Sequence, residues 1–199
     1  MKIDAIIVAA GPSRRFGGDK TSAVLCGHPI LHYPLMAAVR SRCRSVTAVV
    51  ASTGIADILP HGVLMIVNEN PGHGMSSSII AGIRSIPEDS DGVLIIPGDE
   101  PLLQESLLDR LISACEEDDG SIASCTLSGK PVSPAVFPRS YFQELIELRG
   151  DSGGREVLLR HRDRLRTVPV DEWQLMDVDL PEDLREAEAE GLRRGILRK

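Results

Sequence analysis

The sequence predicts an α/β fold in which helices cover both faces of a doubly wound, mostly parallel, Rossmann-like sheet. Apolar runs alternate with segments of helical periodicity along the first hundred residues, which is the order expected of successive β-α-β units. The runs AIIVAA (5–10) and VLIIP (93–97) are apolar throughout, as in strands buried on both faces. The 199 residues suffice for one substantial domain and contain no obvious linker, so we expect a single domain.

The individual elements follow from these patterns in chain order. In the first half we expect a strand at 3–10, a helix at about 30–42, strands at 45–52 and 63–69, a helix at about 76–86 and a strand at 91–99. In the second half we expect a helix near 104–117, strands at 121–127 and 133–137, helices at 141–148 and 153–161, and strands at 165–170 and 174–179. A last helix begins at Pro181, a residue suited to the first helical position, with Glu182 and Asp183 at the positive end of its dipole.

The composition argues against nucleic acid and membranes as partners. The formal net charge is −7, whereas binding to a nucleic-acid backbone requires clustered Lys and Arg. Aromatic residues make up 3% of the chain, too few for a base-stacking surface. The apolar runs are too short to span a bilayer. One lysine and then an acid precede the first apolar run, which is typical of a strand start and not of a signal peptide.

Cysteine usage favours a reduced, cytoplasmic location. The four cysteines are far apart and form no CxxC pair, so the sequence suggests neither a zinc site nor a disulfide framework. They are Cys26, Cys43, Cys115 and Cys125.

A glycine-rich, basic stretch, VAAGPSRRFGGDK (8–20), closes the first predicted strand. Open α/β sheets bind phosphates at this place, where backbone N–H groups point at anionic oxygens. The dinucleotide fingerprint GxGxxG does not match, because Ser13 stands where a second glycine would have to follow Gly11. The Walker loop fails because Asp19 stands where a glycine must precede Lys20. The loop therefore predicts neither an enzyme that uses a dinucleotide hydride carrier nor a P-loop kinase.

The arginines and the lysine of this loop, together with its glycines and its serine, could bind and neutralise a triphosphate. Arginine offers fork-shaped donors to phosphate and lysine a point charge. The candidate groups are Gly11, Ser13, Arg14, Arg15, Gly17 and Lys20. The alternative is a solvated turn with surface arginines.

A second cluster, GHGMSSSIIAGI (72–83), places glycines and hydroxyls before a helical pattern. Its functional interpretation is that these groups line a nucleotide beside the first loop. The alternative is that Ser76 or Ser77 is a helix N-cap. His73 is expected to be a loop residue, because no second His or Cys has suitable spacing.

Two further clusters carry carboxylates. Asp99 in PGDEP (97–101) follows an apolar strand and faces the same crevice as the first loop, and Mg²⁺ prefers one or two carboxylates plus substrate phosphates. The alternative is a turn aspartate. In DVDLPED (177–183), Asp177 and Asp179 would point to the same face of a strand, so both could approach one metal, or one could cap the last helix.

With these four clusters in order, the chain resembles the MobA-like nucleotidyltransferases, whose opening signature is LAAGxSxRxGxxK. It matches that signature at Gly11, Ser13, Arg15, Gly17 and Lys20. Within the family it is most similar to the molybdenum cofactor cytidylyltransferases, which accompany enzymes of the xanthine dehydrogenase type. The segments that carry this closer likeness are GMSSS, GDEP, SPAVFPRSYFQELIEL, GDSGGREVLLRH and DVDLPEDL.

The resemblance implies transfer of CMP from CTP to the terminal phosphate of molybdopterin or its molybdenum form, with release of pyrophosphate. It implies one nucleotidyltransferase domain over 1–199, with a nucleotide-binding half at about 1–100 and an acceptor-side half at about 101–199. A client molybdoenzyme of the xanthine dehydrogenase type is implied as a partner.

The resemblance also implies roles for single residues. The catalytic residues would be Arg15, Lys20 and Asp99. The nucleotide would be bound by Ala10, Gly11, Ser13, Arg14, Gly17, Gly74 and Ser78. Mg²⁺ would be held by Asp99 with Asp179, although Asp177 remains an alternative to Asp179. A pterin-side surface would include Gly153, Gly154 and Arg155.

Glu100 departs from the family pattern, which often carries glutamine there. It adds a carboxylate beside the expected metal and so leaves the acceptor less defined than the reaction type. Three alternatives therefore remain: a GTP-dependent relative, a transferase for another phosphorylated acceptor, and a non-catalytic protein that binds or delivers the molybdenum cofactor.

Overall fold

The computed structural model describes residues 1–11, 13, 15–118 and 120–198. Arg14, a predicted nucleotide-binding residue, therefore lies outside the described residues. The strands are β1 (Ile3–Ala9), β2 (Val24–Leu25), β3 (His28–Pro29), β4 (Val46–Val50), β5 (Val63–Val67), β6 (Gly92–Pro97), β7 (Ile122–Leu127), β8 (Lys130–Pro138) and β9 (Leu165–Pro169). The α-helices are α1 (His32–Arg40), α2 (Met75–Ser85), α3 (Glu105–Glu116), α4 (Phe142–Glu147), α5 (Gly154–Arg160) and α6 (Pro181–Arg193).

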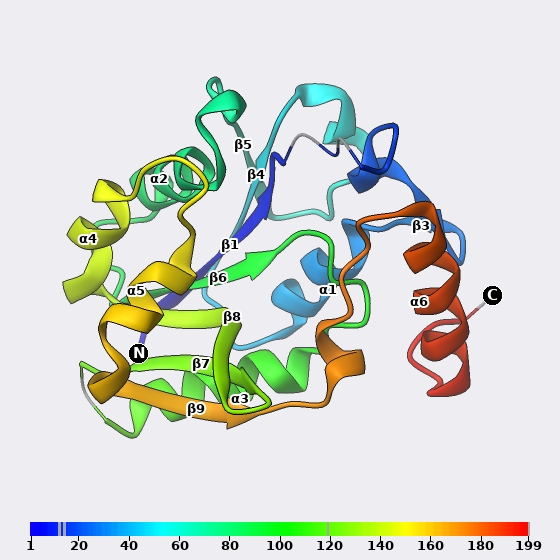
Figure 1. The fold of residues 1–199 in the computed structure, drawn as a ribbon. Coiled ribbons are helices and arrows are strands. Elements are labelled where there is room, and N and C mark those ends of the chain that lie inside the picture. Colours follow the sequence, from blue (N-terminus) through cyan, green and yellow to red (C-terminus); the bar gives the residue numbers. More distant parts are fainter. Residues whose placement is uncertain (12, 14, 119, 199) are drawn as a thin grey trace.

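Seven strands form one sheet in the order β5-β4-β1-β6-β8-β7-β9 (Figure 1). All neighbouring pairs are parallel except those of β8, which runs antiparallel to both β6 and β7. The predicted fold class, a mostly parallel doubly wound sheet in a single domain, is therefore confirmed.

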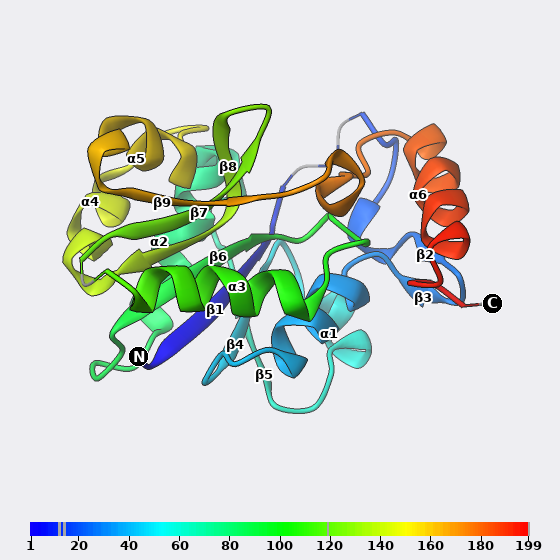
Figure 2. The ribbon, with the colours of Figure 1, turned by 90° about the horizontal axis from the view of Figure 1, so that it is seen from below.

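Helices cover both faces of the sheet, as its apolar strands require. On one face, α1 and α3 lie side by side (Figure 2) and pack with Ile7 and Leu94 into one buried cluster. On the other face, α2, α4 and α5 pack with Ile6 and Phe137 into a second cluster. Side chains alternate across a strand, so adjacent residues such as Ile6 and Ile7 enter different clusters, and both are fully buried.

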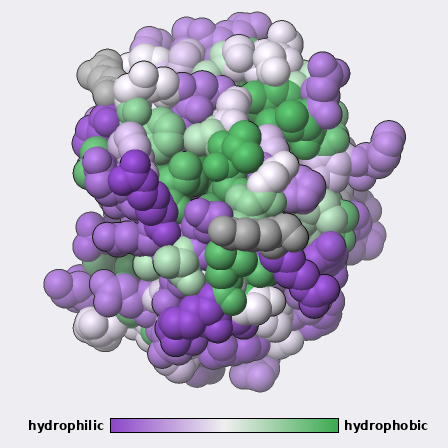
Figure 3. Space-filling view, turned by 90° about the vertical axis from the view of Figure 1, so that its right-hand side faces the viewer, coloured by the Kyte–Doolittle hydropathy of each residue, from purple (hydrophilic) through white to green (hydrophobic). Residues whose placement is uncertain are grey.

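A small hairpin and the last helix form a third apolar cluster at one end of the molecule. Strand β2 of the hairpin contributes Leu25, the residue after β3 contributes Ile30, and helix α6 contributes Ala187. The face that carries α6 shows apolar side chains gathered among hydrophilic ones (Figure 3). Helix α6 begins at Pro181 as predicted. No helix in the described part of the chain is both long enough and apolar enough to cross a membrane.

The predicted strand at 174–179 is wrong. A short 3-10 helix, Glu172–Leu175, is followed by extended chain that joins no sheet. The alternating pattern arises because Met176 and Val178 pack into the third cluster while the intervening Asp177 does not. The backbone N–H of Val178 donates to the carbonyl oxygen of Asp99 at 3.0 Å, so this segment crosses the carboxyl end of β6 without extending the sheet.

Candidate active site at the switch point of the sheet

The candidate site lies where the direction of strand connection reverses. Strand β1 pairs with β4 on one side and with β6 on the other, and ligands of open α/β sheets bind outside the carboxyl ends of such strands. The N–H of Gly98 donates to the carbonyl oxygen of Val8 at 3.0 Å. The loops after β1 and β6, which carry the first and third sequence clusters, therefore leave the sheet side by side.

The loop after β1 ends in a short 3-10 helix, Lys20–Ser22, that fixes the backbone of Lys20. Asp19 caps it: one carboxylate oxygen accepts from the N–H and the hydroxyl of Thr21, and the other accepts from the hydroxyl of Ser22 at 2.6 Å. Partial burial raises the pKa of Asp19, but the hydrogen bonds from Ser22 and Thr21 outweigh it and lower the pKa overall. The residue that excludes a Walker loop thus anchors this turn.

The ammonium of Lys20 lies between two carboxylates. Its Nζ is 2.7 Å from Oδ2 of Asp99 and 2.9 Å from Oδ1 of Asp179. The other oxygen of Asp179 is 2.7 Å from Nη2 of Arg15. The Lys20 side chain is 13% exposed, both aspartates are 28% exposed, and Arg15 is 72% exposed. Four of the sequence-predicted catalytic and metal-binding residues therefore meet in one cluster.

The electrostatics of this cluster favour charged forms. Burial lowers the pKa of Lys20, but the charges and hydrogen bonds of Asp99 and Asp179 more than offset it and raise the pKa. Burial raises the pKa of Asp179, yet Lys20 and then Arg15 lower it overall. Lys20 and Asp179 are thus both stabilised as ions by their neighbours.

Asp177 differs from Asp179. Burial, followed by the charges of Asp99 and Asp179, raises the pKa of Asp177, whereas Asp179 points its oxygens at Lys20 and Arg15. Neither residue caps α6: the N-cap is Leu180, and the carboxylate of Asp183 accepts from the backbone N–H groups of Asp179 and Leu180. In this arrangement the carboxylates of Asp179 and Asp99 both approach Nζ of Lys20.

Glu100, the residue after Asp99, is buried. It is 7% exposed, and its Oε2 has no hydrogen-bond partner. Burial, and then the charges of Asp99 and Asp177, raise its pKa well above the usual value. A buried carboxyl with a raised pKa differs from the extra carboxylate that the sequence suggested beside the metal.

The remaining predicted residues of the first loop surround the Lys20 turn. Ala10 is buried at the end of β1, and Gly11 is exposed. Ser13 has a left-handed φ of 41°, and its carbonyl oxygen accepts from the N–H of Phe16 at 3.1 Å. Gly17 has a φ of 76°. A backbone hydrogen bond thus closes this turn, and the side chain of Arg15 extends from it to Asp179.

The second sequence cluster forms the start of α2. Gly74 is its N-cap, so the expectation of Ser76 or Ser77 at that position is wrong. Ser77 instead donates its hydroxyl hydrogen to the carbonyl oxygen of Gly74 at 2.7 Å. The Ser77 side chain therefore points back toward the N-cap residue, which is a glycine and has no side chain of its own.

A residue that sequence reasoning missed organises this helix start. Asn68 follows β5 and is 4% exposed. Its Nδ2 donates to the hydroxyl oxygens of Ser77 and Ser78 at 2.8 and 3.0 Å, and its Oδ1 accepts from the N–H of Asn70. The available signal was a polar residue closing the apolar run VLMIV. Ser78, a predicted nucleotide-binding residue, is thereby fixed and buried.

The predicted acceptor-side segment packs against this same helix start. A Cβ placed on Gly74 would lie 2.4 Å from the carbonyl carbon of Gly150, and one on Gly153 would lie 2.6 Å from the sulfur of Met75. The N–H of Ser76 donates to the carbonyl oxygen of Gly150 at 3.1 Å. The two glycine-rich segments are therefore in direct contact, although about 75 residues separate them in the chain.

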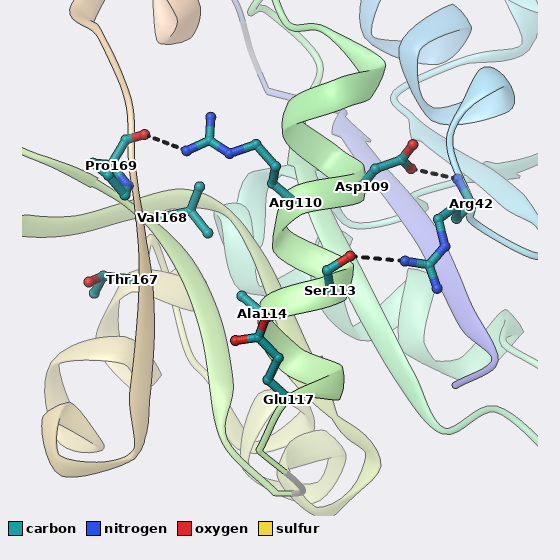
Figure 4. Close-up of a pocket in the computed structure, with 9 residues that line it drawn as sticks. All are labelled: Arg42, Asp109, Arg110, Ser113, Ala114, Glu117, Thr167, Val168 and Pro169. Atoms are coloured by element: carbon teal, nitrogen blue, oxygen red, sulfur yellow. Dashed lines mark hydrogen bonds between the residues drawn. The ribbon is translucent and has the colours of Figure 1, made fainter.

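Two pockets lie outside the charged cluster. One is bordered by His73, Ser76, Ser77 and Arg149. The other lies between α3 and β9, and its cations are already engaged: Arg110 donates to the carbonyl oxygen of Pro169, and Arg42 donates to the hydroxyl of Ser113 (Figure 4). Asp109 and Glu117 also line this second pocket, and their carboxylates disfavour a phosphate there.

No group of three or more His, Cys, Asp or Glu residues in the described part of the chain could hold a metal alone. The site instead has two converging carboxylates, Asp99 and Asp179, next to two cations. Two hard oxygen ligands are the number that Mg²⁺ takes from a protein when substrate phosphates and water complete its shell. The residues present therefore fit a metal shared with a phosphate ligand better than a metal bound by protein alone.

Comparisons with known proteins support this picture. The purine catabolism protein PucB of Bacillus subtilis is 28% identical over 192 residues, which cover 89% of this chain and 92% of that protein. The molybdenum cofactor guanylyltransferase of Shewanella putrefaciens is 25% identical over 80% of each chain. The chain spans 30% of the bifunctional protein GlmU of Anaeromyxobacter dehalogenans, to which it is 25% identical.

Solved structures agree with the fold. The Mycobacterium sp. strain JC1 homologue of Rv0371c superposes with a TM-score of 0.84 at 23% identity, over 98% of this chain and 100% of that one. Rv0371c of Mycobacterium tuberculosis, solved in complex with manganese, gives a TM-score of 0.80 at 22% identity, over 95% and 99% of the two chains. The family model of the MobA-like NTP transferase domain matches residues 5–165, so the chain belongs to the MobA-like NTP transferase domain family.

Proposed function

We propose that this nucleotidyltransferase moves CMP from CTP to the terminal phosphate of molybdopterin or its molybdenum form and releases pyrophosphate. The observation that carries the reaction type is the cluster of Arg15, Lys20, Asp99 and Asp179 at the switch point of the sheet. The choice of a molybdopterin acceptor is supported by relatives named molybdenum cofactor guanylyltransferase.

In this reaction a phosphate oxygen of the acceptor attacks the α-phosphorus of the nucleotide. A new P–O bond forms, the bond to the β-phosphate oxygen breaks, and the electron pair leaves with pyrophosphate. Such a displacement needs positioning and neutralisation of developing charge rather than a covalent nucleophile. In this proposal Lys20, which is 13% exposed, would neutralise the triphosphate, and the exposed Arg15 would bind its outer oxygens.

We propose Mg²⁺ as the cofactor, held by Asp99 and Asp179. When bound, it would polarise the α-phosphate and neutralise the leaving pyrophosphate. The donor set supports this proposal, because two aspartate carboxylates converge on one point. The manganese complex of the structural relative Rv0371c is consistent with a divalent metal in this fold.

The binding surfaces for the two substrates follow from the same geometry. The backbone of Ala10, Gly11, Ser13 and Gly17 would cradle the triphosphate, and the start of α2 at Gly74 and Ser78 would line the nucleoside. The segment around Gly153 that packs on this helix start would face the pterin. A client molybdoenzyme of the xanthine dehydrogenase type is part of the proposal, and the name of the relative PucB, a purine catabolism protein, agrees with it.

The choice of base is the finer part of the proposal. Cytidine is favoured by the segments GMSSS and GDSGGREVLLRH quoted above, and guanosine by relatives named guanylyltransferase. Thermal unfolding with each nucleotide and Mg²⁺ separates them, because a ligand at a hundredfold excess over its Kd stabilises the native state by about 2.7 kcal/mol. We expect CTP to stabilise the protein more than GTP or ATP. A larger rise in the melting temperature with GTP than with CTP would assign guanosine in place of cytidine. An unchanged melting temperature with every nucleotide would favour a protein that binds or delivers the cofactor without catalysis.

The residue roles are tested by Lys20→Ala and Asp99→Ala. Each variant should fold, since both side chains lie at the crevice and not in an apolar cluster. Each should lose about 10²–10³ in the rate of pyrophosphate release, as is typical when one transition-state contact is removed. Wild-type pyrophosphate release in either variant would overturn the assignment.

A further inference from the structure

Lys20 holds the place between the two carboxylates that a metal ion would need. Its Nζ lies within 2.9 Å of one oxygen of each aspartate. We infer that Lys20 keeps free divalent metal off Asp99 and Asp179, so that the site takes its metal only as a complex with a nucleoside triphosphate. This inference rests on the proposed function and names the form in which its nucleotide substrate binds.

The charges around the cluster leave a free metal ion at a disadvantage. A divalent cation could reach Asp99 and Asp179 only by breaking two charge-assisted hydrogen bonds, or by binding beside an ammonium that repels it. Arg15 holds the other oxygen of Asp179, which adds a second unit of positive charge. Glu100 is buried, and Asp177 is a further carboxyl close enough to interact with the charges of Asp99 and Asp179. The aspartate pair is thus already neutralised by the protein itself.

A metal–triphosphate complex changes this balance. Its phosphate oxygens give Lys20 and Arg15 new anionic partners at the moment when the aspartates exchange the ammonium for the metal. The lysine side chain has a flexible four-carbon stem, while its backbone is fixed by the turn that Asp19 caps. The exchange therefore needs movement of the Lys20 and Arg15 side chains but not of the Lys20 backbone.

The test measures binding of Mn²⁺ alone to the nucleotide-free protein, by the electron paramagnetic resonance signal of the free ion. Wild type should bind Mn²⁺ weakly. Lys20→Met should bind it roughly tenfold more tightly or better, because a charge within a few ångströms of the metal is removed. Lys20→Arg, which keeps the charge, should remain weak. The matched control is Lys2→Met, which removes one charge from a lysine that pairs with Asp89 at the surface.

A second substitution locates the gain in affinity. Adding Asp99→Asn to Lys20→Met should abolish the tighter Mn²⁺ binding, because one of the two ligands loses its charge. Thermal unfolding of each variant shows that it is folded, and Lys20→Gln is a second neutral replacement if the methionine variant is not.

The inference is overturned if the neutral variants bind Mn²⁺ no better than wild type, or if Lys2→Met gains as much. The proposed function fails separately, if wild type forms no dinucleotide from CTP and molybdopterin, because the Mn²⁺ measurement uses neither substrate. If the inference and the proposed function are both correct, Lys20→Met should bind Mn²⁺ tightly and should also have lost turnover.

Discussion

Gly74 joins the start of α2 to the loop before α5, and replacing it should break that junction. Its backbone has φ 82° and ψ −174°, a combination that only glycine adopts without strain. A Cβ at this position would lie 2.4 Å from the carbonyl carbon and oxygen of Gly150 and 2.6 Å from Oδ1 of Asp151. Two of these three atoms belong to the backbone, so rotation of a side chain cannot relieve the contact.

The expected loss has two parts. A non-glycine residue in this backbone region costs about 1–3 kcal/mol, and forcing an extra methyl group against packed atoms costs about 1–3 kcal/mol more. Gly74→Ala should therefore lower the free energy of unfolding by roughly 2–6 kcal/mol, a large share of the total for a typical domain.

Urea denaturation of Gly74→Ala beside Gly72→Ala measures this effect. Gly72 lies two residues earlier, and a Cβ there would meet no atom within 4 Å, so its variant should unfold close to wild type. Where Gly74→Ala is still folded, its KM for the nucleotide should rise, because the helix start that holds Ser78 is displaced. Equal midpoints for the two variants would refute the close contact between the two segments.

Three further predictions concern buried contacts. Asp4 is 1% exposed, and although burial raises its pKa, hydrogen bonds from Arg44 and two serines lower the pKa below 3.8 overall. The contribution of ionised Asp4 to the free energy of unfolding is therefore complete above pH 3.8 and is lost as the pH falls through the folded-state pKa. Asp4→Asn should flatten the loss of unfolding free energy between about pH 4 and pH 2, and an unchanged slope would contradict the shift. Asn68→Ala should cost about 1–3 kcal/mol in urea denaturation, since it leaves buried partners unsatisfied; a wild-type midpoint would contradict its organising role. Gly82→Ala adds a Cβ 2.6 Å from Cγ2 of Ile6, so overpacking of about 1–3 kcal/mol should outweigh the gain in helix propensity of about 1 kcal/mol, and a raised melting temperature would contradict this packing.

The charged cluster could be predicted from sequence for a physical reason. Parallel strands put their carboxyl ends at one edge of a sheet, so residues that follow two neighbouring strands meet there. Lys20 after β1 and Asp99 after β6 obey this rule. Asp179 was predicted with them, but the predicted strand that was to carry it does not form.

The ion pairing and the junctions between distant segments could not be predicted. Nothing in the local pattern shows that Lys20 bridges the two predicted metal ligands, because the pairing depends on three segments of the chain. The contact of Gly74 with Gly150 and the network of Asn68 likewise depend on tertiary packing. Glu100 was expected in the crevice because it follows Asp99, yet successive residues point in different directions, and its carboxyl is buried.

Transfer of a nucleotidyl group, as opposed to a phosphate, is the central claim, and label position in CTP tests it most directly. The protein is supplied with molybdopterin, Mg²⁺ and CTP labelled in either the α- or the γ-phosphate. The account predicts that the α-label enters a dinucleotide product and that the γ-label leaves entirely in pyrophosphate. Appearance of the γ-label in the pterin product, or release of both labels without any dinucleotide, would contradict it.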